Sequence, residues 1–216
     1  MHSSVQNLIN IKKLIDVNLK INKVPKIIAV SKTFSIDKII PLIEYGHTDF
    51  GENKVQEGID KWTILKENNQ NINLHLIGGL QTNKVKFAVK IFNYIHSLDS
   101  EKLAKKIFEE QKKQNKKVKI FIQVNIGDEK QKSGITKLSL PSLYSYCKSL
   151  NLDVIGLMCI PPLDESPIDY FKEVNNLNKN LGLNELSMGM SADYIDAIKN
   201  SATYLRIGSS IFGKRV

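Results

Sequence analysis

The chain lacks the features of disulfide-rich, secreted and membrane-spanning proteins. It has 2 cysteines among 216 residues, Cys147 and Cys159, which is too few for a disulfide framework and favours a reducing compartment. No segment approaches the roughly 18 consecutive apolar residues that a membrane-spanning helix needs. The first residues also lack the basic cluster and unbroken apolar run of a signal peptide. We therefore expect a cytoplasmic protein that makes no contact with a membrane.

Arginine is scarce, although the chain as a whole is basic. Lys and Arg total 31 against 22 Asp and Glu, which gives a formal net charge of +9, yet only Arg206 and Arg215 are arginines. Ile, Lys and Asn have AT-rich codons and are all abundant, so the basic excess is weak evidence for nucleic-acid binding. The lysine-rich tract at 111–119 has no interleaved aromatic residues, and we interpret it as a solvated surface.

Motifs for metals and nucleotides are absent or incomplete. His47, His75 and His96 lie on three different predicted strands, without the i, i+4 spacing of a metal site, so we interpret them as core or rim residues. Segment 208–214 matches most of a P-loop, but Arg215 stands where a Ser or Thr must bind magnesium. We therefore expect neither a metal site nor a nucleoside triphosphate site.

What the chain has instead is a regular alternation of strand-like and helix-like segments. Short apolar runs rich in β-branched residues predict eight strands, at 26–31, 47–50, 73–78, 94–98, 117–125, 153–158, 185–190 and 203–208. Apolar residues at helical spacing predict the helices, at 4–20, 36–46, 53–66, 81–90, 100–114, 139–150, 168–181 and 191–200.

This alternation favours a closed barrel. Eight parallel strands joined by helices can close without leaving an exposed edge. The alternative is an open doubly wound sheet, but no G-x-G-x-x-G turn follows the first strand and the alternation shows no break. We predict a single α/β domain over residues 1–216, a (β/α)8 TIM barrel with an extra N-terminal helix.

In such a barrel the site lies at the carboxyl ends of the strands, and Lys32 directly follows the first strand. By composition alone Lys32 would be a solvated lysine. At the inner mouth of a barrel, however, partial desolvation lowers the pKa of a lysine and frees its lone pair. A neutral amine is what a Schiff base with an aldehyde requires.

Three further segments place polar groups at the same mouth. Gly208 and Ser209 follow the last strand, where barrels of this type usually bind phosphate through backbone N–H groups. Ser191 and Asn53 each precede a predicted helix, so each fits an N-cap. Alternatively, the hydroxyl of Ser191 would bind an anion and Asn53 would bond a polar ring substituent.

Closure of the barrel brings these segments together. The first strand lies next to the eighth in a closed barrel, so Lys32 faces Arg206 and Gly208 across the mouth. A ligand with an aldehyde at one end and a phosphate at the other would bridge them. Pyridoxal 5'-phosphate (PLP) fits this description. A phosphorylated sugar aldehyde in a Schiff-base aldolase fits as well, so the spacing leaves the choice open.

Six segments resemble, in order and spacing, the pyridoxal phosphate homeostasis protein family, whose small members are similar to the N-terminal barrel of alanine racemase. They are IIAVSKTF (27–34), FGENKVQE (50–57), LHLIGGLQTNK (74–84), GLM (156–158), LSMGMSADY (186–194) and RIGSSIFGKR (206–215). The resemblance spans almost the whole chain. It implies a single barrel that holds PLP.

The resemblance also implies roles for individual residues. They are Lys32 for the Schiff base, Arg206 near the pyridine nitrogen, Gly208, Ser209 and Ser191 for the phosphate, and Asn53 and Met188 at the border of the ring. The sequence departs from the family at Gly79, where a larger residue is common. The loss of that larger side chain would loosen the wall near the third strand.

The family implies a carrier or regulator of PLP and amino-acid pools that hands the cofactor to PLP-dependent apoenzymes, without an established turnover reaction and without assigned catalytic residues. A two-base racemase takes its second acid/base group from another domain across a dimer interface. We expect a monomer, because no exposed apolar stripe stands out. Two alternatives remain, a PLP-dependent amino-acid racemase or decarboxylase and, from the charge of +9, a nucleic-acid-binding protein.

Overall fold

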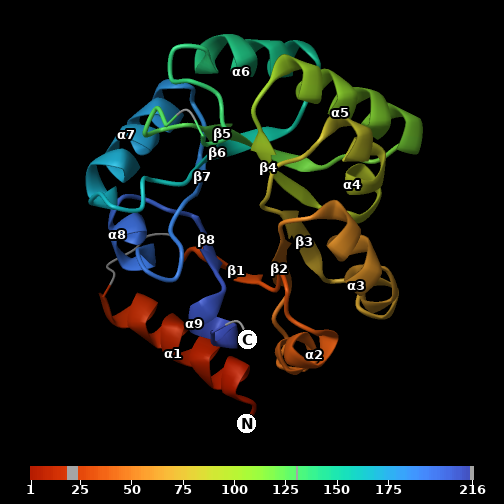
Figure 1. The fold of residues 1–216 in the computed structure, drawn as a ribbon, viewed down its shortest axis with the longest axis vertical. Helices are drawn as coiled ribbons and strands as arrows, with labels where there is room; N and C mark the ends of the chain where they lie inside the picture. Colours follow the sequence, from red (N-terminus) through yellow and green to blue (C-terminus); the bar gives the residue numbers. More distant parts are fainter. Residues whose placement is uncertain (19–23, 130, 215–216) are drawn as a thin grey trace.

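Eight parallel strands form a closed barrel in the order β1 to β8, as predicted (Figure 1). The computed structural model describes residues 1–18, 24–129 and 131–214. The strands are β1 (Lys26–Val30), β2 (Asp49–Glu52), β3 (Asn73–Leu76), β4 (Tyr94–Leu98), β5 (Lys119–Val124), β6 (Val154–Cys159), β7 (Glu185–Ser187) and β8 (Tyr204–Ile207). The seam closes where β1 pairs with β8, with Ile28 opposite Arg206.

Helices cover the outside of the barrel. They are α1 (Ser3–Asn18), α2 (Ile36–Glu44), α3 (Val55–Asn68), the short 3-10 helix η1 (Thr82–Lys84), α4 (Val85–Ile91), α5 (Glu101–Gln114), α6 (Leu140–Ser149), α7 (Pro167–Asn180), α8 (Tyr194–Lys199) and α9 (Ser209–Phe212). The extra helix α1 lies beside α9, where the side-chain amide of Asn7 donates to the carbonyl of Ile211 at 3.0 Å (Figure 1). Within the described residues, no helix is long and apolar enough to cross a membrane.

Several predicted boundaries differ from the structure. The seventh strand ends at Ser187 instead of 190, because Gly189 has a φ of +88°, which breaks the extended conformation. The second strand begins at Asp49 instead of 47. Residues 19 and 20 of the predicted first helix, and Arg215 of the incomplete P-loop, lie outside the described residues.

Both predicted side-chain caps are wrong. The cap of α3 is Lys54, in an extended conformation, rather than Asn53. The cap of α8 is Asp193 rather than Ser191. In each case the chain extends further before the helix begins, so the predicted capping residue stays at the mouth of the barrel.

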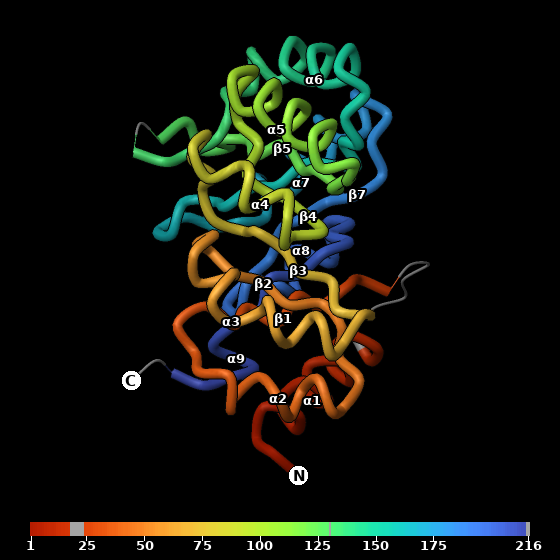
Figure 2. Tube along the Cα trace, turned by 90° about the vertical axis from the view of Figure 1, so that its right-hand side faces the viewer, coloured from red at the N-terminus to blue at the C-terminus, as the bar shows by residue number. Residues whose placement is uncertain are grey.

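Side chains alternate between two buried faces of each strand, because the helices cover the outer face and the barrel encloses the inner one. The inner apolar cluster consists of Ile28, Tyr94, Phe121, Met158 and Tyr204. The outer cluster between strands and helices is much larger. The loops that follow β5 and β6, green and cyan at the left of Figure 2, project to the same side as the C-terminal end of the chain. This side is the mouth at which the strands end.

Candidate functional site

A cavity of about 680 Å³ lies at the carboxyl ends of the strands. Lys32 reaches it because it lies two residues beyond Val30, on the same alternation that turns Ile28 into the barrel. Six of the seven predicted site residues line this cavity, namely Lys32, Asn53, Ser191, Arg206, Gly208 and Ser209. The structure therefore brings together residues from both ends of the sequence.

Met188, the seventh predicted residue, is not among those that line the cavity. Because the side chain of Ser187 points inward, Met188 points outward, and it is fully buried in the cluster between strands and helices. Met190, two residues further on, lines the cavity instead. The segment after β7 thus reaches the cavity through Met190 rather than through Met188.

Arg206 forms the floor of the cavity from β8, with 4% of its surface exposed. Its Nη1 donates to the hydroxyl of Ser187 and its Nη2 donates to the carbonyl of Cys159, both at 2.8 Å. Burial lowers the pKa of Arg206, but a guanidinium has no accessible neutral form in proteins. The result is a fixed cation whose other N–H donors bond no acceptor among the residues that the structure describes, and these donors face the cavity.

The segment after β8 forms the second polar wall. Gly208 precedes α9, and the N–H groups of a first helical turn have no acceptor within their own helix. The hydroxyl of Ser191 accepts from the N–H of Ser210 at 3.3 Å, so it contacts α9 rather than capping α8. Lys214 lies at the same edge. These groups present N–H donors and a positive charge on one side of the cavity.

Asn53 lies opposite, after β2. Its side-chain oxygen is buried and has no hydrogen-bond partner among the described residues. A Cβ atom at the neighbouring Gly78 would lie 2.2 Å from the carbonyl oxygen of Asn53, so only glycine allows the two segments to approach this closely. A buried acceptor without a partner costs about 1–3 kcal/mol. This cost indicates a ligand group that completes the bond.

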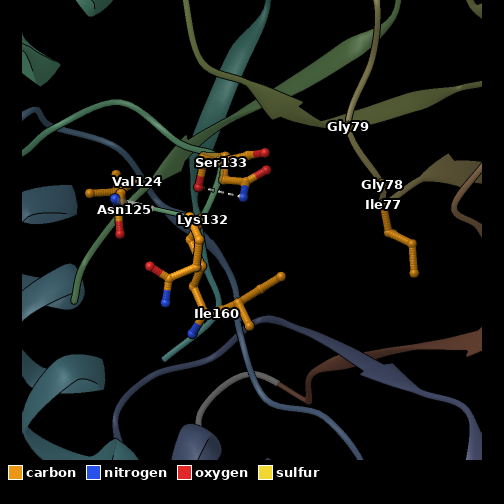
Figure 3. Close-up of a pocket in the computed structure, with 10 residues that line it drawn as sticks. Ile77, Gly78, Gly79, Val124, Asn125, Lys132, Ser133 and Ile160 are labelled. Atoms are coloured by element: carbon orange, nitrogen blue, oxygen red, sulfur yellow. Dashed lines mark hydrogen bonds between the residues drawn. The ribbon is translucent and has the colours of Figure 1, made fainter. Parts of the chain in front are cut away.

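A second cavity, of about 290 Å³, adjoins the first and shares Ile77, Gly78 and Ile160 with it (Figure 3). On its far wall, the amide of Gln123 donates to the carbonyl of Ser133 at 3.0 Å. Gly79 lies at its edge, and a Cβ atom there would meet nothing within 4 Å. A larger side chain would therefore have room at this edge of the cavity, and Gly79 is not among the residues that line the cavity of Arg206.

The residues that hold Arg206 from below were not predicted from the sequence. Ser187 contacts it directly, and His96, His75 and Asp49 continue from Ser187 through the barrel interior. The histidines are fully buried, in agreement with their interpretation as core residues, but they are hydrogen-bonded to one another. One signal in the sequence could have indicated this contact, because His75 and His96 occupy inward positions on the adjacent strands β3 and β4.

The chain resembles known proteins over most of its length. Residues 7–216 match the model of the alanine racemase N-terminal domain. The pyridoxal phosphate homeostasis protein of Aquifex aeolicus is 40% identical over 200 residues, covering 88% of this chain and 87% of that protein. The protein of the same name from Haemophilus influenzae is 36% identical over 201 residues, covering 88% and 85%.

Solved structures give the same result. PipY of Synechococcus elongatus with PLP bound superposes with a TM-score of 0.87 at 28% identity, covering 97% of this chain and all of that one. Alanine racemase of Clostridium difficile shares the fold, with a TM-score of 0.75 at 18% identity, and the match covers 57% of that chain. This chain belongs to the pyridoxal phosphate homeostasis protein family, within the alanine racemase N-terminal domain class.

Proposed function

We propose that this protein binds PLP through a Schiff base at Lys32 and serves PLP, vitamin B6 and amino-acid homeostasis. The observation that carries the proposal is a single cavity lined by Lys32, Arg206, Gly208 and Ser209. A primary amine condenses with an aldehyde, and N–H groups and cations hold a phosphate. The PLP-bound PipY structure and the names of the relatives support the same conclusion.

The residues present fit this group. The unpartnered oxygen of Asn53 suits a hydrogen-bond donor on the ligand, and the space that Gly208 leaves beside Val30 suits a close approach. Lys214 and the hydroxyl of Ser191 add polar partners at the phosphate end. Met190, rather than the side chain of Met188, would provide the sulfur-containing wall of the ring site.

Arg206 would set the character of the bound ring. When bound, PLP supplies an aldehyde and an electron-withdrawing pyridine ring. A guanidinium beside the ring nitrogen can only donate, so it leaves that nitrogen without a proton of its own. The ring would then be a weaker electron sink, which favours holding the cofactor over turning over amino acids.

The cavity lining supports binding over racemisation. In the part of the chain that the structure describes, its titratable side chains are Lys32, Arg206 and Lys214, without a carboxylate, histidine or tyrosine. A racemase needs a second acid/base group on the other face of the ring. The racemase or decarboxylase alternative therefore has less support, and Lys32 would be its single base.

The wider setting is part of the same proposal. We infer that residues 1–216 act as one domain, as a monomer in the cytoplasm, and that the recipients of the cofactor are PLP-dependent apoenzymes. The uninterrupted barrel supports the single domain. Proteins that carry a reactive aldehyde in a reversible bond can release it to a second amine, which is the chemistry that a transfer requires.

Replacement of Lys32 by alanine tests the proposal. We expect the wild-type protein to take up PLP, turn yellow and show the absorption band of an imine. K32A should lose this band, because Lys214, the other described amine of the cavity, lies at the phosphate end rather than at the end of β1. Borohydride reduction followed by mass spectrometry should locate the adduct on the peptide that contains Lys32.

Lys38, an exposed lysine of α2, provides the matched control. K38A removes one lysine of the same region without touching the cavity, so its absorption band should equal that of the wild type. An unchanged band in K32A, or an adduct on a different peptide, would overturn the assignment.

A further inference from the structure

A continuous line of hydrogen bonds crosses the barrel interior beneath the cavity. Arg206 Nη1 and Ser187 Oγ are 2.8 Å apart, as are Ser187 Oγ and His96 Nδ1. His96 Nε2 lies 3.0 Å from His75 Nδ1, and His75 Nε2 lies 3.0 Å from Asp49 Oδ1. The five side chains come from β8, β7, β4, β3 and β2, all from inward positions. The line thus joins the cation of the cavity to a carboxylate at the opposite end of the barrel.

The two imidazoles are enclosed by rings as well as by hydrogen bonds. His75 stacks on Tyr94 with ring centroids 4.2 Å apart, and His96 stacks on Phe121 at 4.4 Å. Both histidines have no exposed surface. A charge on either imidazole would have no access to water. Their environment therefore selects the neutral form.

The charged groups around the two histidines also favour the neutral imidazoles. Burial lowers the pKa of His75 against the opposing effect of Asp49, and the positive charges of Lys26 on β1 and Lys66 on α3 lower it further. Burial also lowers the pKa of His96 well below its usual value, with His75 and Arg206 adding to the effect.

The carboxyl group at the far end stays ionised. Burial raises the pKa of Asp49, but the hydrogen bonds from His75 and Thr48, with the nearby Lys26, outweigh it, so the pKa lies below its usual value. The line therefore has a cation at one end, a carboxylate at the other and two neutral rings between them.

These charge states determine the direction of every hydrogen bond. An ionised Asp49 can only accept, so His75 donates from Nε2, and its bare Nδ1 accepts from Nε2 of His96. The bare Nδ1 of His96 then accepts from the hydroxyl of Ser187, whose oxygen accepts from Arg206. Since a guanidinium can only donate, the two ends of the line require the same direction. Both histidines must carry their proton on Nε2.

We propose that Ser187, His96, His75 and Asp49 are positioning residues that hold the Arg206 guanidinium in one orientation at the floor of the cavity. The line fixes Nη1 of the guanidinium, the carbonyl of Cys159 fixes Nη2, and the distant carboxylate offsets the buried charge. The other donors of the guanidinium then serve a ligand. The consequence for PLP rests on the proposed function, because it requires the ring nitrogen of bound PLP to face Arg206.

The first test needs no cofactor. Long-range proton–nitrogen NMR spectra of the ¹⁵N-labelled wild-type protein report which ring nitrogen of each histidine carries the proton. We expect His75 and His96 to be neutral with the proton on Nε2 from pH 6 to pH 8. A proton on Nδ1 of either ring, or titration of either ring in this range, would overturn the proposal.

The second test uses S187A, which removes the link between Arg206 and His96. Ser97 on β4 offers the matched control, because its hydroxyl is buried but has no hydrogen-bond partner among the described residues. We expect S187A to shift the Nδ1 resonance of His96 and to raise the dissociation constant of PLP about tenfold, the size of one hydrogen bond to a charged group. S97A should change neither, and S187T, which keeps the hydroxyl, should restore both.

The two proposals fail in different ways. If the wild-type protein forms no imine with PLP, the proposed function fails, and the histidine spectra still decide on the line of hydrogen bonds. If the wild type binds PLP and S187A binds it with the same affinity and the same His96 resonance as S97A, the positioning role is wrong. Failure of S187A to fold leaves the wild-type spectra as the deciding measurement.

Discussion

Two carboxylates of β2 lie three residues apart on opposite faces of the barrel wall. Both are buried, but their hydrogen bonds are distributed differently over the two carboxylate oxygens. Asp49, on the inner face, spreads its bonds over both oxygens, one to His75 and one to Thr48. Glu52, on the outer face, concentrates three donors on Oε1, from Ser31, Lys61 and Trp62, while Oε2 is buried without a partner among the described residues.

The difference appears in the ionisation of the two groups. The pKa of Asp49 lies below its usual value because its hydrogen bonds outweigh burial. The pKa of Glu52 is raised, because burial outweighs the bonds from Trp62 and Ser31 and the charge of Lys61. Inside the barrel both carboxylate oxygens have partners, whereas outside it one oxygen takes all the donors and the other is buried without a partner among the described residues. The comparison teaches that burial alone does not set the cost of a charge.

The largest expected effect is on the outer face, at Trp62. Its indole is fully buried, packs on Phe50 with ring centroids 4.8 Å apart and donates to Glu52. W62A should lower the free energy of unfolding by about 3–5 kcal/mol, because it leaves a cavity. W62F keeps a ring and loses the N–H, which should cost about 1–3 kcal/mol. Trp62 is the only tryptophan, so urea denaturation should be followed by circular dichroism. Equal losses for both variants would contradict the cavity argument.

The second effect is on the inner face. D49N removes the charge that accepts from His75 and should lower the free energy of unfolding by about 1.5–3 kcal/mol at pH 7. The depressed pKa means that Asp49 stabilises the folded state above its unfolded pKa, and that this contribution disappears as the pH falls through the folded pKa. The difference between wild type and D49N should therefore shrink below about pH 4. A difference that grows on acidification would contradict the assignment of an ionised Asp49.

The smallest effect is expected for E52Q. Gln keeps an oxygen that can accept from Ser31 and Trp62, and Lys61 keeps its 2.7 Å contact with Glu57. The loss at pH 7 should therefore stay within about 1 kcal/mol. Its pH dependence should have the opposite sign. Because the folded pKa of Glu52 is raised, wild-type stability falls as the pH rises through that pKa, and E52Q gains relative to wild type. Denaturation midpoints at pH 4, 6 and 8 measure this, and slopes of the same sign for D49N and E52Q would break the comparison.

The barrel and its mouth could be predicted because they depend on patterns that are local or follow from closure. Alternation of strands and helices gave the fold, and adjacency of the first and last strands placed Lys32 beside Arg206 and Gly208. Period-two alternation explains why Lys32 faces inward. None of these features depends on the register between neighbouring strands.

The features that could not be predicted depend on the register between strands or on contacts between residues far apart in the sequence. Asn53 and Ser191 have the residue types of helix caps, but tertiary contacts hold them at the cavity instead. The histidines meet because the register places His75 opposite Tyr94 and brings His96 within reach. A sequence pattern does not contain this register. The facing of Ser187 and Met188 depends on the phase of the alternation in β7, and this strand of 3 residues is too short to show its phase in the sequence.

The seam between β1 and β8 has a consequence for the biogenesis of the protein. Lys32 leaves the ribosome early and Arg206 late, and only docking of the last strand against the first puts them in one cavity. An incomplete chain would thus lack one wall of this cavity, and a ligand that contacts the segments after both strands would stabilise the pairing of β1 with β8. Occupancy of the proposed site would then report a finished barrel, and loading with the vitamer would raise its stability.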